Sequence, residues 1–331
     1  MNNENIVSGI RPTGKLHLGN YFGAVKSFVE MQHHFNCFFF IADYHALTTH
    51  PDASNLKIYR KQIVAEYLAC GLDPELCTIY VQSQIPEISE LYLLLNMNAY
   101  LGELERCTSF KDKVRTQPNN VNAGLLTYPV LMTADILIHK GTKVPVGKDQ
   151  EQHLEIARDL ADRFNKLHNN EYFPLPQAFN FDRDLIKVPS LSGNGKMGKS
   201  ENDKYTIFLT DSPEIIVKKI KQSPTDSGPT VLNSSKPESI SALFDIMKAV
   251  STEEIHNHYN ELYLTCKIKY KDLKEQLAKD IINFLNPIQE EIDKYLHSSN
   301  VIDKIIKEGK EKATNSARAT IKDVRSIIGL D

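Results

Sequence analysis

His17 and Asn20 lie one helical turn apart beside Gly19, in the stretch SGIRPTGKLHLGN (residues 8–20). An apolar pair precedes this stretch and an amphipathic run follows it, a pattern typical of a passage from a strand into a helix. Glycine lets the backbone approach a ligand closely, and the N–H groups at a helix N-terminus bind phosphate. The glycine spacing fits neither the dinucleotide-binding G-x-G-x-x-G pattern nor a P-loop. By itself, the stretch is equally consistent with an ordinary strand–helix turn.

Lys196 and Lys199 lie in a second glycine-rich stretch, GKMGKS (residues 195–200). Lysine carries a compact positive charge on a flexible stem. Two lysines in a flexible loop suit a polyphosphate on which negative charge develops during a reaction. Taken alone, the pair is also typical of a solvated basic surface loop.

A parallel sheet is expected to position the first stretch, because strand and helix patterns alternate over the first half of the chain. The expected strands are short apolar runs: residues 37–43, 78–83 and 143–147. The expected helices are residues 52–70, capped by Asp52 and ended by Gly71, a run from Pro86, and residues 149–166. This alternation predicts an α/β fold with a doubly wound parallel sheet. Such folds bind ligands at the carboxyl ends of their strands, which is where the first stretch lies.

The second half of the chain is expected to be mostly helical. The predicted helices cover residues 213–222, 237–249, 252–264, 267–296 and 299–328. Pro287 falls inside one of them and is expected to kink or divide it. From residue 212 onward, basic and acidic residues are equal in number, so this part has no net basic charge.

Composition narrows the class of protein. At about 150 residues per domain, 331 residues suggest about two domains. Charged residues make up 24% and the net charge is −3, which argues against a disordered tail protein or a histone-like DNA binder. No apolar run approaches the length of a membrane span, and the N-terminus lacks the features of a signal peptide. The five cysteines form no C-x-x-C pair, so we expect a cytoplasmic protein without a membrane segment or a structural metal site.

Together, the two stretches resemble the H-I-G-H and K-M-S-K-S signatures of class I aminoacyl-tRNA synthetases. Other runs are similar to the bacterial-type tryptophanyl-tRNA synthetases: GELERCTSFKDK, AGLLTYPVLMTADIL, VPVGKDQEQHLEIARDLADRFN and, near the end, GKEKATNSARATIKDVRSIIGL. The likeness follows the family's order and covers essentially the whole chain.

The resemblance implies a two-step reaction. The carboxylate of L-tryptophan attacks the α-phosphorus of ATP, giving tryptophanyl-adenylate and pyrophosphate. The terminal adenosine hydroxyl of tRNA(Trp) then takes the tryptophan. Mg²⁺ is implied on the phosphates, and no side-chain nucleophile is needed because positioning and electrostatic stabilisation suffice. The family also implies a homodimer.

The resemblance places the residues that bind ATP in both stretches and in the region between them. The catalytic residues implied are His17, Asn20, Lys196 and Lys199. The implied ATP-binding residues are Arg11, Pro12, Thr13, Gly19, Asn20, Gly147, Lys148, Asp149, Val188, Lys196, Met197, Gly198, Lys199 and Ser200. Two positions depart from the signatures. Asn20 replaces the second histidine, which the tryptophan-specific family tolerates, and Gly198 replaces the central serine, which puts the timing of loop closure in doubt.

The resemblance places the centre of the tryptophan-binding site in the apolar run that contains Asp135. Asp135 is implied to accept the indole N–H, and Tyr128 and Gln150 to bind the amino group. The implied pocket walls are Val7, His45, Met132, Val144 and Val146. From the residues alone, Asp135 is equally consistent with a helix-packing role, and His45 and Met132 are more typical of core positions. A buried carboxylate needs a partner in either case.

The resemblance also implies a domain division. A Rossmann-like catalytic domain covers residues 1–195 and is joined by the returning helix 300–331, whereas residues 196–299 hold the lysine loop and a helical anticodon-binding domain. Three other functions stay open. Tyrosyl-tRNA synthetases share the architecture, a non-catalytic paralogue could bind RNA, and an adenylate-forming nucleotidyltransferase would not need the long helical part.

Overall fold

The fold is known from a computed structural model, which describes residues 4–147, 150–179, 187–198 and 203–331. Its described part contains a parallel sheet in the order β3-β2-β1-β4-β5. The strands are β1 Asn5–Ile10, β2 Asn36–Ile41, β3 Cys77–Val81, β4 Lys143–Val144 and β5 Gln177–Ala178. The order reverses at β1, the point where doubly wound sheets bind ligands. The predicted Rossmann-like α/β fold is confirmed.

Alternating side chains of the central strands pack into two separate hydrophobic cores, one on each face of the sheet. Ile6 of β1 and Phe39 of β2 lie in one apolar cluster, and Val7 and Phe38 lie in the other. Both strands are therefore buried on both faces, which explains their continuous apolar sequence. The strand predicted over 143–147 is shorter in the structure, because Pro145 has no N–H for the ladder.

The first half of the chain supplies helices to both faces of the sheet. They are α1 Leu18–Asn20, α2 Lys26–Met31, α3 Asp43–Ala46, α4 Ala53–Ala69, α5 Pro86–Asn96, α6 Leu101–Arg106, α7 Thr108–Thr116, α8 Ala123–Leu137 and α9 Glu151–Leu167. Short turns η2 Leu47–Thr49 and η3 Gln82–Gln84 follow α3 and β3. The predicted cap of α4 is confirmed, since the Asp52 carboxylate accepts the N–H groups of Ser54 and Asn55.

The second half is helical as predicted. Its helices are α10 Pro213–Gln222, α11 Glu238–Val250, α12 Glu253–Leu264, α13 Tyr270–His297 and α14 Ser299–Ile328. The prediction that Pro287 could divide α13 is wrong, because the helix continues through it. Leu285, Ile288 and Ile292 are buried on either side of the proline, and their packing holds the helix together.

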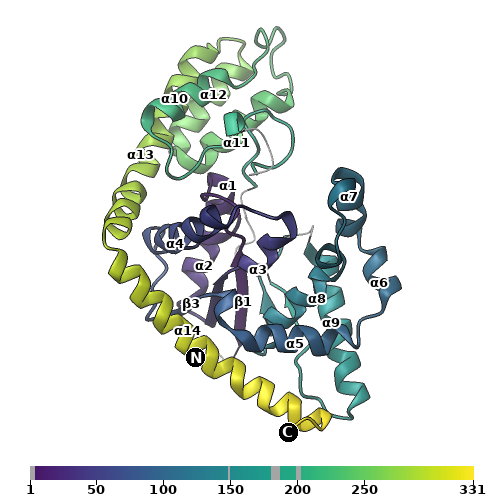
Figure 1. Ribbon diagram of the computed structural model, residues 1–331. Helices are drawn as coiled ribbons and strands as arrows, with labels where there is room; N and C mark the ends of the chain where they lie inside the picture. Colours follow the sequence, from purple (N-terminus) through teal and green to yellow (C-terminus); the bar gives the residue numbers. More distant parts are fainter. Residues whose placement is uncertain (1–3, 148–149, 180–186, 199–202) are drawn as a thin grey trace.

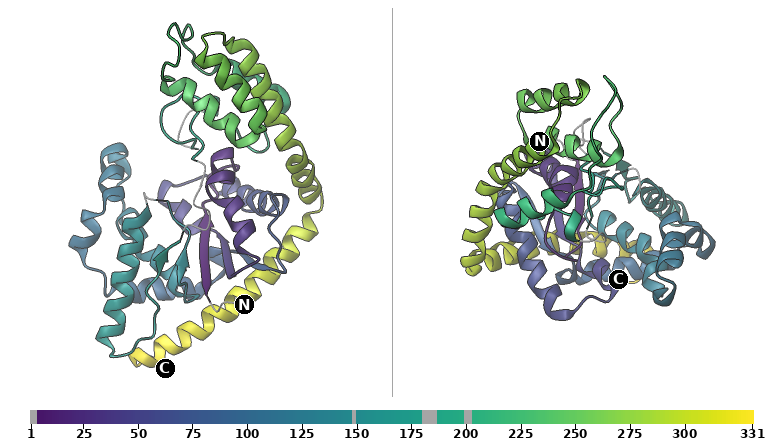
Figure 2. Two further views of the ribbon diagram at one scale, coloured as in Figure 1. Left: turned by 180° about the vertical axis from the view of Figure 1, so that it is seen from behind. Right: turned by 90° about the horizontal axis from the view of Figure 1, so that it is seen from above.

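The helices α10, α11 and α12 form a group above the carboxyl end of β1 (Figure 1). The helix α13 leads from this group down one side of the molecule, and α14 passes beneath the sheet, as the view from behind also shows (Figure 2). None of the helices that the structure describes is both long and apolar enough to cross a membrane.

The helix α14 crosses the edge strand β3 and joins both cores. Ile302 packs in the cluster on one face of the sheet, and Ala313 packs in the cluster on the other. Between them, Gly309 lies against β3 so closely that an added Cβ would sit 1.7 Å from the carbonyl oxygen of Ile79. The helix thereby covers a strand edge that would otherwise be open to pairing with another chain.

Candidate functional site

The predicted phosphate stretch forms a fixed turn between β1 and α1. The Nδ1 atom of His17 accepts the N–H of Asn20, and the Asn20 side-chain oxygen accepts the N–H of His17, both at 3.2 Å. This reciprocal cap orients both side chains. Because Nδ1 is an acceptor, the proton of the neutral imidazole lies on Nε2, which can donate to a phosphate oxygen.

The two predicted signature stretches lie against each other. A Cβ added to Gly19 would come within 3.0 Å of the carbonyl oxygen of Met197. The backbone of Leu18 donates to the carbonyl of Ile207 at 3.0 Å, just beyond the lysine loop. The Met197 N–H donates to the carbonyl of Val188, also at 3.0 Å. The structure therefore brings Gly19, Val188 and Met197 together, as the resemblance implied.

The other implied ATP residues differ in exposure, and four of them lie outside the described residues. Arg11, Thr13, Gly147 and Lys196 are exposed, Gly198 is half-buried and Pro12 is buried. The carbonyl of Gly147 accepts the N–H of Gln150 at 2.8 Å. The remaining four implied positions, Lys148, Asp149, Lys199 and Ser200, lie outside the described residues.

Glu66 is a residue of this junction that sequence reasoning missed. Its side chain, fully buried in α4, accepts the N–H of Leu16 at 2.9 Å, one residue before His17. Gln62 donates to its other oxygen at 3.0 Å. An acidic residue inside the apolar run of α4 was the available signal, because a buried carboxylate is stable only with donors around it.

Asp135 is the buried acceptor at the predicted tryptophan site. It lies in α8 with 1% exposure, and the Nε2 atom of His45 contacts its Oδ2 atom at 2.8 Å. Gln82 donates to both carboxylate oxygens, at 2.7 and 2.9 Å. Burial raises the pKa of Asp135, and the hydrogen bonds from His45 and Gln82 oppose that rise. The predicted pair of Asp135 and His45 is thus brought together, and Gln82 joins it unpredicted.

Tyr128 and Gln150 meet through a histidine that sequence reasoning missed. His153, buried in α9, places Nδ1 at 2.8 Å from the side-chain oxygen of Gln150 and at 2.9 Å from the hydroxyl of Tyr128. Ser109 of α7 contacts its Nε2 atom at 2.8 Å. These oxygens can accept hydrogen bonds from an ammonium group. The Tyr128 ring also contacts the His45 ring edge to face, which joins this cluster to Asp135.

The four implied apolar wall residues belong to one cluster on the same side of the sheet. Val7 and Val144 are buried in it, and Met132 and Val146 pack against it. Asp135 lies on the same helix as Met132, three residues further along, so the predicted pocket combines an apolar side with a buried carboxylate.

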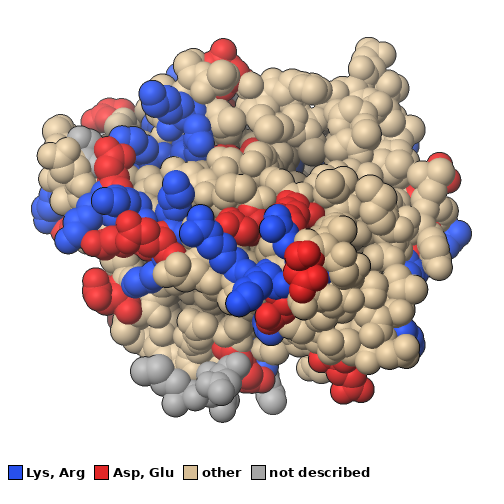
Figure 3. Space-filling view, turned by 60° about the horizontal axis from the view of Figure 1, so that its bottom comes forward, with Lys and Arg blue, Asp and Glu red and all other residues tan. Residues whose placement is uncertain are grey.

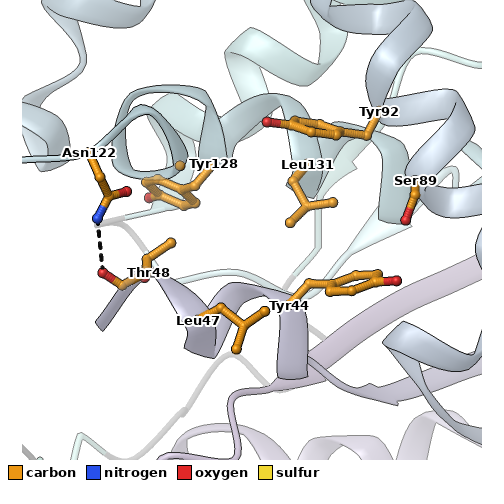
Figure 4. Close-up of a pocket in the computed structure, with 9 residues that line it drawn as sticks. Tyr44, Leu47, Thr48, Ser89, Tyr92, Asn122, Tyr128 and Leu131 are labelled. Atoms are coloured by element: carbon orange, nitrogen blue, oxygen red, sulfur yellow. Dashed lines mark hydrogen bonds between the residues drawn. The ribbon is translucent and has the colours of Figure 1, made fainter. Parts of the chain in front are cut away.

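A cavity of about 360 Å³ lies beside this cluster (Figure 4). Its lining residues come from α3, η2, α5, α8 and the turn before α8: Tyr44, Leu47, Thr48, Ser89, Tyr92, Asn122, Gly124, Tyr128 and Leu131. Tyr128 is shared with the amino-group cluster, and Tyr44 is adjacent to His45 in sequence. The cavity is mainly apolar and aromatic, and nothing in the sequence pattern pointed to it.

Comparisons with known proteins identify the family of this chain. The model of the family "tRNA synthetases class I (W and Y)" matches residues 2–286. A tryptophan–tRNA ligase of Porphyromonas gingivalis is 57% identical over 326 residues, 98% of this chain and 99% of that protein. Another, of Listeria monocytogenes, is 42% identical over 328 residues, 98% of this chain and 97% of that protein.

Solved structures of tRNA synthetases are also similar to this chain. The crystal structure of the tryptophanyl-tRNA synthetase of Campylobacter jejuni complexed with ADP and tryptophan is similar with a TM-score of 0.86 and 34% identity, covering 98% of this chain and 100% of that one. The tyrosyl-tRNA synthetase of Aeropyrum pernix, at 19% identity and a TM-score of 0.66, shares the fold, covering 92% of this chain and 89% of that one.

Proposed function

This chain belongs to the class I tRNA synthetases of the tryptophan and tyrosine group, and from that premise we propose that it is a tryptophan–tRNA ligase. The observation that carries the choice of an aromatic amino acid with a ring donor is the buried carboxylate of Asp135, held by His45 and Gln82 beside an apolar wall. A phenol O–H can also donate to this carboxylate, so Asp135 alone does not separate tryptophan from tyrosine. An indole ring needs apolar surroundings and one acceptor for its N–H. The full-length likeness to tryptophan-specific relatives favours tryptophan.

Tryptophan activation requires positioning more than covalent chemistry. The clustered oxygens of Tyr128 and Gln150 suit the amino group of tryptophan, which leaves its carboxylate directed at the α-phosphorus of ATP. His17 and Asn20 suit the triphosphate at the turn after β1. As the bond to the α-phosphorus breaks, Lys196 and Lys199 stabilise the charge that grows on the departing pyrophosphate.

Mg²⁺ fits this scheme as a companion of ATP. Within the described ranges, no group of three or more His, Cys, Asp or Glu side chains is placed to hold a metal ion. Mg²⁺ is commonly held by substrate phosphates and water together with few protein ligands. The ion would neutralise part of the phosphate charge. His17, Asn20 and the two lysines of this chain would orient the triphosphate and neutralise the remaining charge.

The helical part is suited to hold the tRNA. The group α10–α12 stands above the sheet edge that carries the site (Figure 1). The helix α13 connects it to that site, since the Phe284 ring stacks on Phe22, two residues after Asn20, with centroids 5.4 Å apart. We assign anticodon reading to residues 196–299, catalysis to residues 1–195 with helix 300–331, and the activity to the cytoplasm, where charged tRNA is used.

A second copy of the chain is proposed to cover one apolar surface. Leu93 of α5, Met97 directly after α5, Leu101 of α6 and Tyr100 between these helices are exposed. Leu47 is also exposed, and it lines the cavity of Figure 4. Exposed apolar side chains at this density mark a contact surface. A homodimer would bury them beside the tryptophan site.

Amino-acid-dependent exchange of pyrophosphate into ATP tests the proposed activity. Tryptophan should support exchange, and tyrosine and phenylalanine should support it far less. Preference for tyrosine would favour the tyrosyl-tRNA synthetase alternative. Absence of exchange with every amino acid would favour a non-catalytic RNA-binding paralogue, for which binding of tRNA without ATP is the positive sign.

A further inference from the structure

We propose that Gln82 is the positioning residue that makes Asp135 selective for an amino acid whose ring carries an N–H donor. The inference rests on the tryptophan–tRNA ligase function proposed above. Gln82 is fully buried where β3 ends, at the same edge of the sheet as the turn that carries His17. Neither signature stretch includes it.

The amide of Gln82 is fixed in one orientation. Its Oε1 atom accepts the backbone N–H of Tyr44 at 3.0 Å. A backbone N–H can only donate, so the atom that faces it has to be the oxygen. The amide nitrogen therefore faces Asp135, which it contacts at 2.7 Å on Oδ1 and 2.9 Å on Oδ2. A flipped amide would place two donors against each other at Tyr44.

This orientation makes Asp135 an acceptor. An amide nitrogen donates only, and His45 supplies a second donor to Oδ2 when its Nε2 atom is protonated. An ionised carboxylate has about four lone-pair positions. The hydrogen bonds among the described residues use two on Oδ2 and one on Oδ1. One position on Oδ1 is left for a donor from the substrate.

The selectivity between amino acids depends on whether the substrate ring fills this remaining lone-pair position on Oδ1 of Asp135. An indole N–H fills it, whereas a ring without a donor leaves a buried carboxylate lone pair without a partner, which is costly. If Gln82 lost its donor, burial would favour the protonated carboxyl, because its bond is among those that oppose the rise in the pKa of Asp135. A protonated carboxyl can donate as well as accept, so it would discriminate less between rings.

The test compares L-tryptophan with L-3-(3-benzothienyl)alanine, in which a sulfur atom replaces the ring N–H at nearly the same shape. The ratio of kcat/KM for the two amino acids in pyrophosphate exchange does not depend on the fraction of active protein. Gln82→Met keeps the side-chain length and removes the donor. We expect it to lower the ratio by about 10–100-fold, the range for a hydrogen bond to a charged group, mostly through loss on tryptophan.

Gln84→Met is the matched control, since Gln84 lies in the same turn and its buried side-chain oxygen has no hydrogen-bond partner among the described residues. Its ratio should equal that of the wild type. If Gln82→Met fails to fold, as judged by circular dichroism, Gln82→Leu serves in its place. That variant also lacks the donor to Asp135, so the ratio should again fall. An unchanged ratio in a folded Gln82 variant overturns the inference, whereas a wild-type protein that activates neither amino acid refutes the proposed function instead.

Discussion

At the scale of single residues, the site depends on one charge that is buried among fixed donors. Asp135 is removed from water, and His45 and Gln82 supply the hydrogen bonds that water would have given. Because burial and hydrogen bonding act on its pKa in opposite directions, with burial the larger effect, the charge of Asp135 is sensitive to pH and to its neighbours.

Tryptophan affinity is expected to fall as the pH is lowered, beginning above the ordinary titration range of an aspartate. The ionised carboxylate accepts the indole N–H, and burial raises the pKa of Asp135. Binding is therefore complete above that raised pKa and is lost as the pH falls through it. The chain contains no tryptophan residue, so all indole emission comes from the ligand, and the change in its emission spectrum on binding measures the bound fraction.

Asp135→Asn should weaken tryptophan binding at neutral pH by about 10–100-fold and remove this acid limb. The other titratable groups around the carboxylate are His45, Asp43 and Tyr80. An acid limb that persists unchanged in Asp135→Asn would come from another group, and would contradict the assignment of Asp135 as the acceptor of the indole N–H.

The resemblance identified the residues that would touch the substrate, but not all of the buried side chains that hold them. Asp135, Tyr128 and Gln150 were identified through the resemblance, but Gln82 and His153, which contact them, were not. A sequence pattern shows that a residue is polar or lies at a strand end. It does not show which polar side chains from different elements point at one another, because that depends on packing.

At the scale of elements, the turn that carries His17 is held from behind by α4. The carboxylate of Glu66 accepts the N–H of Leu16 at 2.9 Å in a fully buried position. Glu66→Leu leaves that N–H without an acceptor, so the turn loses its support. We expect about a tenfold lower rate of adenylate formation, from the loss of a hydrogen bond to a charged group.

Glu66→Gln is the matched control, because its amide oxygen can still accept the Leu16 N–H while Gln62 turns its own amide to accept in return. Single-turnover kinetics should give a rate near that of the wild type for this variant, with tryptophan affinity unchanged in both. Equal rates for Glu66→Leu and the wild type would mean that the contact is structural only.

The crossing of α14 over β3 depends on Gly309. A Cβ there would lie 1.7 Å from the carbonyl oxygen of Ile79, so Gly309→Ala has to displace the helix. The free energy of unfolding should fall by about 1–3 kcal/mol, the usual cost of overpacking. In Gly102→Ala, by contrast, the nearest atom is the end of the Arg106 side chain at 3.4 Å, so this helical substitution should be neutral or stabilising. Urea denaturation of both variants and the wild type measures these free energies of unfolding. If Gly309→Ala were as stable as Gly102→Ala, the close packing of α14 on β3 would be contradicted.

Element boundaries were more predictable than their arrangement. The C-terminal helices begin and end within about three residues of expectation, because their amphipathic patterns are long. The helices α6 and α7 and the short strand β5 were not predicted, since runs this short carry little periodicity. Of the two effects expected of Pro287, division of the helix does not occur, because tertiary packing outweighs the missing N–H.

At the scale of the whole molecule, charge is balanced on the face where α14 lies. Seen with the bottom of the molecule forward, basic and acidic side chains are interspersed (Figure 3). Ion pairs such as Lys61–Asp303 and Arg325–Glu90 tie α14 to α4 and α5 there. Such a mixed surface does not attract a polyanion strongly, which supports placing the tRNA on other faces.

The apolar surface on α5 and α6 predicts a dimer in solution. Met97 is 75% exposed, and Met97→Glu would bring a charge into the proposed interface. Sedimentation equilibrium should give a dimer for the wild type and a shift toward monomer for this variant. Leu330→Glu, at an equally apolar position with 62% exposure, should leave the mass unchanged. A wild-type protein that is monomeric at micromolar concentration would contradict the proposed interface.

Charging of tRNA with competing amino acids tests the central claim most directly. The protein is incubated with ATP, Mg²⁺, unfractionated tRNA and equal concentrations of labelled tryptophan and tyrosine, and the aminoacyl-tRNA is recovered and its amino acid identified. The account predicts tryptophan on the tRNA, with tyrosine as a minor product at most, because the relatives that match along the whole chain are tryptophan–tRNA ligases. Recovery of tyrosine as the main product, or of no aminoacyl-tRNA from protein that binds tryptophan, would contradict it.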